Sequence, residues 1–177
     1  MKSLTTPSHM QLSAGNEGVA AKEGHMDRAL RTRMVFHGAA VVLLGMLAGF
    51  PYAFVVTGDL QGSERAWRMA HLEGVLNGLL MLAVAGVGGR LALSAGQARV
   101  LFWALVVTGY GNVVAAVIAA TFAVRGLFPG GSFSNTIVYL LFMAAIGGVF
   151  VALGLLALGA RRPPSAPEQA EERRIRA

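Results

Sequence analysis

Four long blocks of apolar residues, separated by short polar segments, dominate the hydrophobic pattern of the chain. They run over residues 36–56, 70–89, 100–123 and 136–158. Each block is long enough to cross a bilayer as a helix, because about 20 helical residues span its roughly 30 Å hydrocarbon core. The blocks are apolar on all sides and do not alternate with a period of two, which argues against β-strands. The pattern therefore predicts an all-α protein, an integral membrane four-helix bundle.

The segments on either side of the four blocks are polar. Residues 1–33 contain no apolar run before Arg28, which argues against a cleaved signal peptide and favours a mobile polar and basic tail. Residues 34–160 are predicted to form the four-helix domain. Residues 161–177, "RRPPSAPEQAEERRIRA", cannot build a core and are predicted to be a disordered charged tail.

The basic residues predict the topology of the bundle. The chain has a net charge of +6, and 15 of its residues are Lys or Arg. Twelve of these lie before the first block, between the second and third blocks, or after the fourth block. The three exceptions are Arg65, Arg68 and Arg125. By the positive-inside rule, both termini are cytoplasmic. Because topology accounts for the basic charge, no nucleic-acid partner is expected.

Composition narrows the chemistry further. Hydrophobic residues make up 55% of the chain and charged residues 14%, which excludes an ordinary soluble domain. The chain has no cysteine, so it forms no disulfide, has no catalytic thiolate and offers no thiolate ligand to a metal. Any metal must be held by histidine, carboxylate or a cofactor.

The second block, "WRMAHLEGVLNGLLMLAVAG", carries three polar groups where such groups are costly. Glu73 is the only acid within the four predicted spans, and burying its charge unpaired costs at least about 2.5 kcal/mol. Asn77 follows four residues later and shares its helix face. His71 points roughly 200° away from Glu73, at 100° per residue. One face therefore presents a carboxyl group and an amide, and another presents an imidazole.

Several interpretations of these groups remain open from the residues alone. His71 is either a metal ligand or a hydrogen-bonded histidine at a helix start. Glu73 is a protonated packing residue, a proton relay or a group facing a polar cavity. His37 lies at the other end of its span and is interpreted as an interfacial anchor beside Arg33. It is too far from His71 for both to bind one haem within a subunit.

Polar residues of the third block extend this picture. Asn112 is expected at a depth that lets it share a cavity with Asn77, with Thr108 and Tyr110 nearby. The helices are also rich in glycine, which lets helices pack closely in lipid. Because a bundle of this size has little interior volume, a large cofactor fits more easily between subunits than within one.

Three short motifs carry a resemblance to a known family. Trp67-Arg68-Met69-Ala70-His71, followed after five residues by Asn77-Gly78-Leu79-Leu80-Met81, resembles the signature of bacterial styrene oxide isomerases, which are small four-helix membrane proteins. The segments "RMVFHG" from Arg33 and "GYGNV" from Gly109 are similar to parts of the family's first and third helices. The resemblance covers about residues 30–160.

The resemblance implies a cofactor, an assembly and a reaction. It implies a homotrimer in the bacterial inner (cytoplasmic) membrane, with ferric haem b held between subunits and His71 as the axial ligand of the iron. The haem then acts as a Lewis acid on a small hydrophobic epoxide such as styrene oxide. Ring opening and a hydride shift give an aldehyde without net redox. Asn77 matches an active-site asparagine of the family.

The chain also departs from the family at its active site. Thr108 stands where the family has an aspartate, Ala116 stands where it has a tyrosine, and Glu73 occupies a position that is small in the family. Glu73 is therefore a candidate to replace the missing acid and Tyr110 to replace the missing phenol. The candidate catalytic residues are Asn77, Glu73 and Tyr110.

Two other classes of function remain as alternatives. One is a haem-binding membrane protein that acts as a sensor or electron carrier, although a single candidate axial histidine suits substrate or gas binding better. The other is a helical bundle without a cofactor, in which Glu73 relays protons or pairs with another chain.

Overall fold

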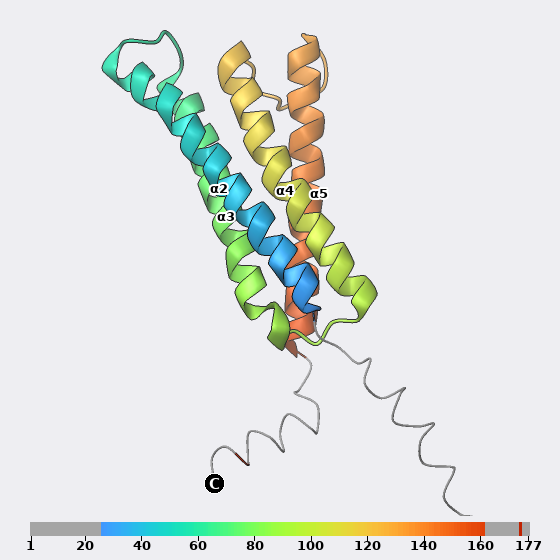
Figure 1. The fold of residues 1–177 in the computed structure, drawn as a ribbon. Coiled ribbons are helices and arrows are strands. Elements are labelled where there is room, and N and C mark those ends of the chain that lie inside the picture. The colour runs from blue at the N-terminus through green and yellow to red at the C-terminus, as the bar shows by residue number, and fades with distance from the viewer. Residues whose placement is uncertain (1–25, 162–173, 175–177) are drawn as a thin grey trace, which may run out of the picture.

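The chain folds into four long helices. The computed structural model describes residues 26–161 and residue 174. The helices are α2 (Arg28–Thr57), α3 (Glu64–Val87), α4 (Ala95–Phe122) and α5 (Phe133–Arg161), and a short 3-10 helix, η1 (Gly88–Arg90), follows α3 (Figure 1). Within the described part of the chain there is no β-strand. The prediction of an all-α protein with four long helices is confirmed.

All four helices have the length and hydropathy of membrane spans. They contain 24 to 30 residues each, more than the about 20 that a bilayer requires. The chain is therefore a multi-pass membrane protein by length and composition. Residues 28–33, assigned to the N-terminal tail from the sequence, form the first turns of α2. The rest of that tail, up to residue 25, and nearly all of the C-terminal tail lie outside the described residues. The cytoplasmic location of both termini stays a prediction.

Local signals explain where the helices begin and end. The Ser63 hydroxyl accepts a hydrogen bond from the Ala66 amide and caps α3, while Ser94 and Gln97 form a reciprocal capping box at the start of α4. Gly58 ends α2 in the left-handed conformation, which glycine adopts without steric cost.

The helices form two hairpins. α2 packs mainly on α3, and α4 packs mainly on α5, while contacts between α3 and α4 join the two pairs. The start of α2, η1 and the end of α5 gather at one end, called here the terminal end (Figure 1). The connections 58–63 and 123–132 lie at the other end, called the loop end, where the hairpins diverge.

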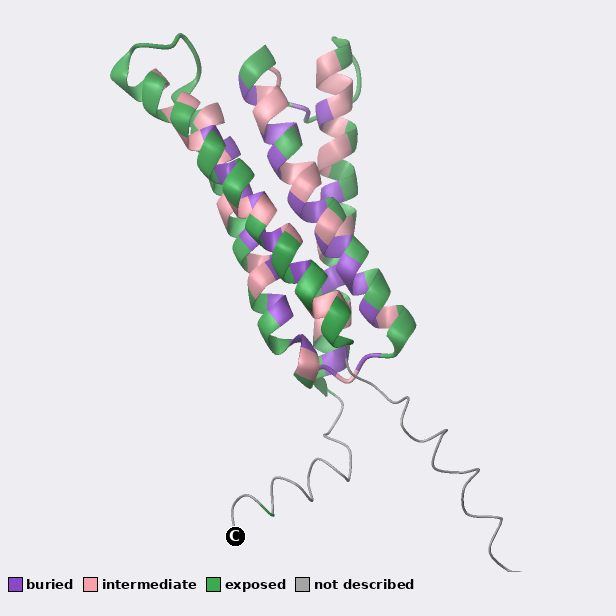
Figure 2. Ribbon diagram, viewed as in Figure 1, coloured by how far each residue is buried: buried purple, intermediate pink, exposed green. Residues whose placement is uncertain are grey.

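The buried core is concentrated toward the terminal end. Its largest cluster includes Met34, Met81, Leu101 and Leu105, whose side chains are fully buried. Toward the loop end, a second cluster is built around three alanines, Ala48, Ala70 and Ala116. Figure 2 shows how exposure increases where the hairpins separate. Small side chains at this end leave room for the cavities described below.

Glycines bring α2 and α3 into close contact. A Cβ atom at Gly45 would lie 2.5 Å from the Val75 amide nitrogen, and one at Gly78 would lie 2.5 Å from a Val42 methyl group. A Cβ at Gly74 would clash with the backbone of Gly45. Backbones at this distance gain the van der Waals contact that drives helix association in lipid.

Gly74→Ala is expected to lower the free energy of unfolding by about 1–3 kcal/mol, the usual cost of overpacking. The added methyl group must push α3 away from the Gly45 backbone. Gly86→Ala is the matched control, because nothing lies within 4 Å of a Cβ at Gly86 on the same helix. Thermal unfolding in detergent measures both variants. Equal Tm values for Gly74→Ala and the wild type would contradict the close packing of α2 on α3.

Candidate functional site

His71 lies on the side of α3 that faces α2. Its Nδ1 atom is 2.9 Å from the backbone carbonyl oxygen of Gly45, and the side chain is partly buried. A Cβ at Gly49 would lie 3.1 Å from the same nitrogen, so the absence of a side chain there makes room for the ring. Two glycines one turn apart on α2 therefore seat the imidazole.

The hydrogen bond to Gly45 determines which ring nitrogen of His71 is available. A carbonyl oxygen only accepts, so Nδ1 must carry the proton and donate. In the neutral ring, Nε2 then carries the lone pair. Metal-binding histidines commonly have this arrangement, in which one nitrogen binds the metal and the other donates to a carbonyl or carboxylate. The position of His71 is therefore suitable for an axial ligand of a haem iron, which would bind at Nε2.

Within the described part of the chain, His71 does not belong to a cluster of metal-binding side chains. Among residues 26–161 and 174, no group of three His, Cys, Asp or Glu side chains could hold a metal ion. A porphyrin supplies four nitrogens of its own, so a haem iron can be held by a single histidine of the protein. The residues present fit a haem with one protein ligand on the iron.

Glu73 and Asn77 form a pair on another side of α3. Asn77 Nδ2 donates to the Glu73 backbone carbonyl oxygen and to Glu73 Oε2, both at 2.8 Å. Both amide hydrogens are thereby used, so Asn77 Oδ1 is left to accept. The carboxyl group and the amide are held together, as their spacing predicts, and the helical repeat places His71 on another side of α3.

Glu73 lines a cavity between the hairpins, called here the chamber. It has a volume of about 630 Å³ and extends to the loop end, where residues of both connections line it. Residues of α3, α4, α5 and the 123–132 connection line it: Ser63, Arg65, Ala66, Met69, Glu73, Ala116, Ala119, Ala123, Val124, Arg125, Leu127 and Phe142. Asn112 lies on the same face of α4, one turn before Ala116. The lining of the chamber therefore combines apolar side chains with one carboxyl group, that of Glu73.

Tyr110 pairs with a histidine of α2. Its hydroxyl group is joined by a 3.2 Å hydrogen bond to His37 Nδ1 on α2, and the two rings meet edge to face. The His37 ring also contacts Phe36 and Phe102. The His37 ring therefore packs between α2 and α4, and its interpretation as an interfacial anchor stays a prediction. A catalytic role for Tyr110 stays a prediction.

Thr108 bridges α4 and α5. Its side chain is 1% exposed, and Oγ1 lies 2.8 Å from the Ala104 carbonyl oxygen and 3.0 Å from the Ala145 carbonyl oxygen. A Cβ at Gly148 would lie 2.6 Å from Oγ1, so the helices are in close contact here. Thr108 therefore acts in helix packing, and a carboxylate at this position would face two carbonyl oxygens that cannot donate a hydrogen bond to it.

Thr108→Val is expected to lower the free energy of unfolding by about 1 kcal/mol, the usual worth of one hydrogen bond, and to leave activity unchanged. Thr121→Val is the matched control, since its exposed hydroxyl makes a similar bond to the Val117 carbonyl within α4. Chemical unfolding and turnover are measured together. A folded Thr108→Val protein with tenfold lower turnover would place Thr108 in the active site.

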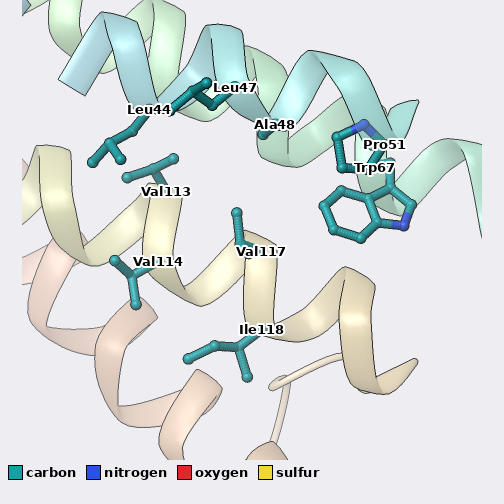
Figure 3. A pocket seen from close by; sticks show the side chains of 9 residues that line it. All are labelled: Leu44, Leu47, Ala48, Pro51, Trp67, Val113, Val114, Val117 and Ile118. Carbon is teal, nitrogen blue, oxygen red and sulfur yellow. The ribbon is translucent and has the colours of Figure 1, made fainter. Parts of the chain in front are cut away.

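A second, apolar cavity lies between α2 and α4. This groove has a volume of about 370 Å³. In Figure 3, Leu44, Leu47, Ala48, Pro51 and Trp67 face Val113, Val114, Val117 and Ile118 across it. None of these side chains can donate or accept a proton in catalysis. The groove suits a hydrocarbon chain or the apolar part of a ligand.

Several contributors to the site are not evident from the sequence. The Gly45 carbonyl and the space at Gly49 position His71, and their spacing of one turn is the signal that marks a close helix contact. Arg65 and Arg125 line one chamber although they are far apart in the sequence. No local pattern brings them together, because their proximity depends on the packing of α4 against α3.

Comparisons with known proteins place the chain among membrane isomerases. Hydroxylaminobenzene mutase HabB from Ectopseudomonas oleovorans is 32% identical over 100 residues, which cover 56% of this chain and 57% of that protein. The chain thus matches little more than half the length of this curated relative. The family model for styrene oxide isomerase matches residues 30–161, which include all four helices, His71, Glu73 and Asn77. The chain therefore belongs to the styrene oxide isomerase family, and both relationships indicate an isomerase-type membrane enzyme.

Proposed function

We propose that the protein is a haem-dependent isomerase that converts a small hydrophobic epoxide, similar to styrene oxide, to an aldehyde without net redox. The observation that carries the proposal is the His71 imidazole, whose Nδ1 donates to Gly45 and whose Nε2 carries the lone pair. Membership of the styrene oxide isomerase family supports the reaction class. When bound, ferric haem b supplies a Lewis acid that polarises the C–O bond to be broken.

The chain supplies orientation and a largely apolar cavity. The chamber takes the apolar body of the substrate, and Glu73 provides a carboxyl group in its lining. Glu73 Oε2 is held by Asn77, so the carboxyl group has a fixed position before the substrate arrives. Groups already oriented toward the reacting atoms lose little free energy to reorganisation during the reaction.

The positions of these groups favour an oligomer. Within one subunit His71 faces α2, while Glu73 lines the chamber between α3, α4 and α5. A second copy of the chain can place its chamber beside the His71 imidazole of the first copy. One substrate then contacts the ligand site of one subunit and the chamber of the other. This argument calls for at least two copies, and the resemblance to styrene oxide isomerases leads us to propose a homotrimer with haem between subunits. We place it in the inner membrane of a bacterium, with both termini cytoplasmic as the basic residues predict.

A second candidate reaction is the rearrangement of a hydroxylaminoarene to an aminophenol. The observation that favours it is the relative named hydroxylaminobenzene mutase. Like the epoxide isomerisation, this reaction rearranges one molecule without net redox, but here the oxygen leaves nitrogen and is found on a ring carbon of the product. Its substrate can donate N–H and O–H hydrogens, and Asn77 Oδ1 is free to accept one.

Turnover of both substrate classes tests the proposal. Purified protein loaded with ferric haem is incubated without reductant or oxygen, first with styrene oxide and then with phenylhydroxylamine. We expect aldehyde from the epoxide; aminophenol without aldehyde would favour the second reaction. A haem-loaded protein that turns over neither substrate, but shows a reversible redox couple or binds a gas, would instead be a sensor or electron carrier.

A further inference from the structure

The chamber has charged groups at two separate levels. Arg65, in the first turn of α3, and Arg125, in the connection between α4 and α5, line its mouth together with Ser63. Glu73 follows Arg65 by eight residues on α3, which is about 12 Å along the helix axis. The two cations and the carboxyl group therefore mark opposite ends of one cavity.

The walls between these levels are apolar. Met69, Ala116, Ala119 and Phe142 come from three different helices and offer no hydrogen-bonding side chain. The volume of about 630 Å³ lies within the range of roughly 300–1,000 Å³ that is usual for small-molecule sites. A whole phospholipid exceeds this space, whereas a ring with a short side chain fits it.

We propose that the chamber binds a small amphipathic organic anion, with its acidic head at Arg65 and Arg125 and its apolar body between the hairpins. The planar guanidinium groups match a carboxylate in charge and in hydrogen-bond geometry. The opposite orientation brings the head next to the Glu73 carboxyl group, where no cation lines the cavity. Binding of this kind requires neither haem nor turnover, so it extends beyond the proposed function and is tested independently of it.

The test uses 4-(trifluoromethyl)phenylacetate as the probe and its primary amide as the uncharged analogue. Full-length protein in nanodiscs of zwitterionic lipid is titrated and followed by fluorine NMR, with empty nanodiscs as the blank. The wild type is expected to bind the acid more tightly than the amide. Arg65→Gln and Arg125→Gln are each expected to weaken binding of the acid about tenfold, the effect of one charged hydrogen bond, and to leave binding of the amide unchanged.

Two further variants make the result specific. Arg68→Gln is the matched control, because Arg68 is exposed near the same end of α3 but does not line the chamber; it should leave binding of the acid unchanged. Ala119→Leu narrows the cavity and should weaken binding of acid and amide alike. Equal affinities for acid and amide, or equal losses in Arg65→Gln and Arg68→Gln, would overturn the proposal. So would displacement of the probe by anionic phospholipid, which would identify a lipid head group as the occupant.

Discussion

His71→Ala is expected to lower the haem content of the purified protein to about a tenth of the wild-type value or less, since even indirect partners of a metal ligand contribute 10- to 100-fold. The variant removes the one imidazole whose Nδ1 is anchored to the Gly45 carbonyl. Turnover of the epoxide should fall at least about 100-fold, the equivalent of about 3 kcal/mol of lost transition-state stabilisation. The Soret absorbance per protein and the initial rate measure the two effects.

His37→Ala is the matched control for the His71 variant. His37 lies on α2, and its Nδ1 is paired with the Tyr110 hydroxyl, so its loss should cost about 1 kcal/mol of stability and leave the Soret band intact. Tyr110→Phe removes the same hydrogen bond and should behave in the same way. If His37→Ala abolished the Soret band and His71→Ala retained it, the assignment of the axial ligand would be wrong.

Glu73→Ala is expected to lower kcat/KM by about 100-fold, the loss that a small misplacement of a positioned group can cause. The carboxyl group lies in the chamber, and its Oε2 holds Asn77 in place. Haem content should stay at the wild-type level, because Glu73 and His71 lie on different sides of α3. The loss therefore appears in turnover while the Soret band is unchanged.

Glu73→Gln separates proton transfer from positioning. The glutamine carbonyl oxygen can still accept from Asn77 Nδ2, but the side chain cannot donate or remove a proton. If Glu73 transfers a proton, Gln and Ala cause the same loss of kcat/KM; if it only positions Asn77, Gln restores most of the activity. Glu64→Gln, an exposed change at the start of α3, is the control. Wild-type kinetics in Glu73→Ala would exclude both roles.

The sequence was sufficient to predict the four helices and the separation of the polar groups on α3. Length and hydropathy are local properties, and the lipid environment requires a span to satisfy its own backbone hydrogen bonds as a helix. The spacing of Glu73 and Asn77 likewise determines that they share a face, and their hydrogen bond confirms it. The helical repeat also places His71 on another side.

Contacts between helices could not be predicted in the same way. Tyr110 was expected near Asn77, and its hydrogen bond to His37, which depends on the position of α4 beside α2, was not predicted. Thr108 was expected near the same cavity, yet its hydroxyl reaches the Ala145 carbonyl on α5. An apolar helix offers several similar faces for packing, so the sequence leaves its rotation and its neighbours open.

The most direct test of the proposed reaction is the fate of deuterium in styrene oxide that carries two deuterium atoms on its terminal carbon. The haem-loaded protein is incubated without reductant or oxygen, and the product is analysed at short times by mass spectrometry and NMR. A hydride shift predicts an aldehyde that retains both deuterium atoms, one on the aldehyde carbon and one on the neighbouring carbon. Absence of aldehyde, or loss of one deuterium to solvent in the first turnovers, would contradict the proposed isomerisation.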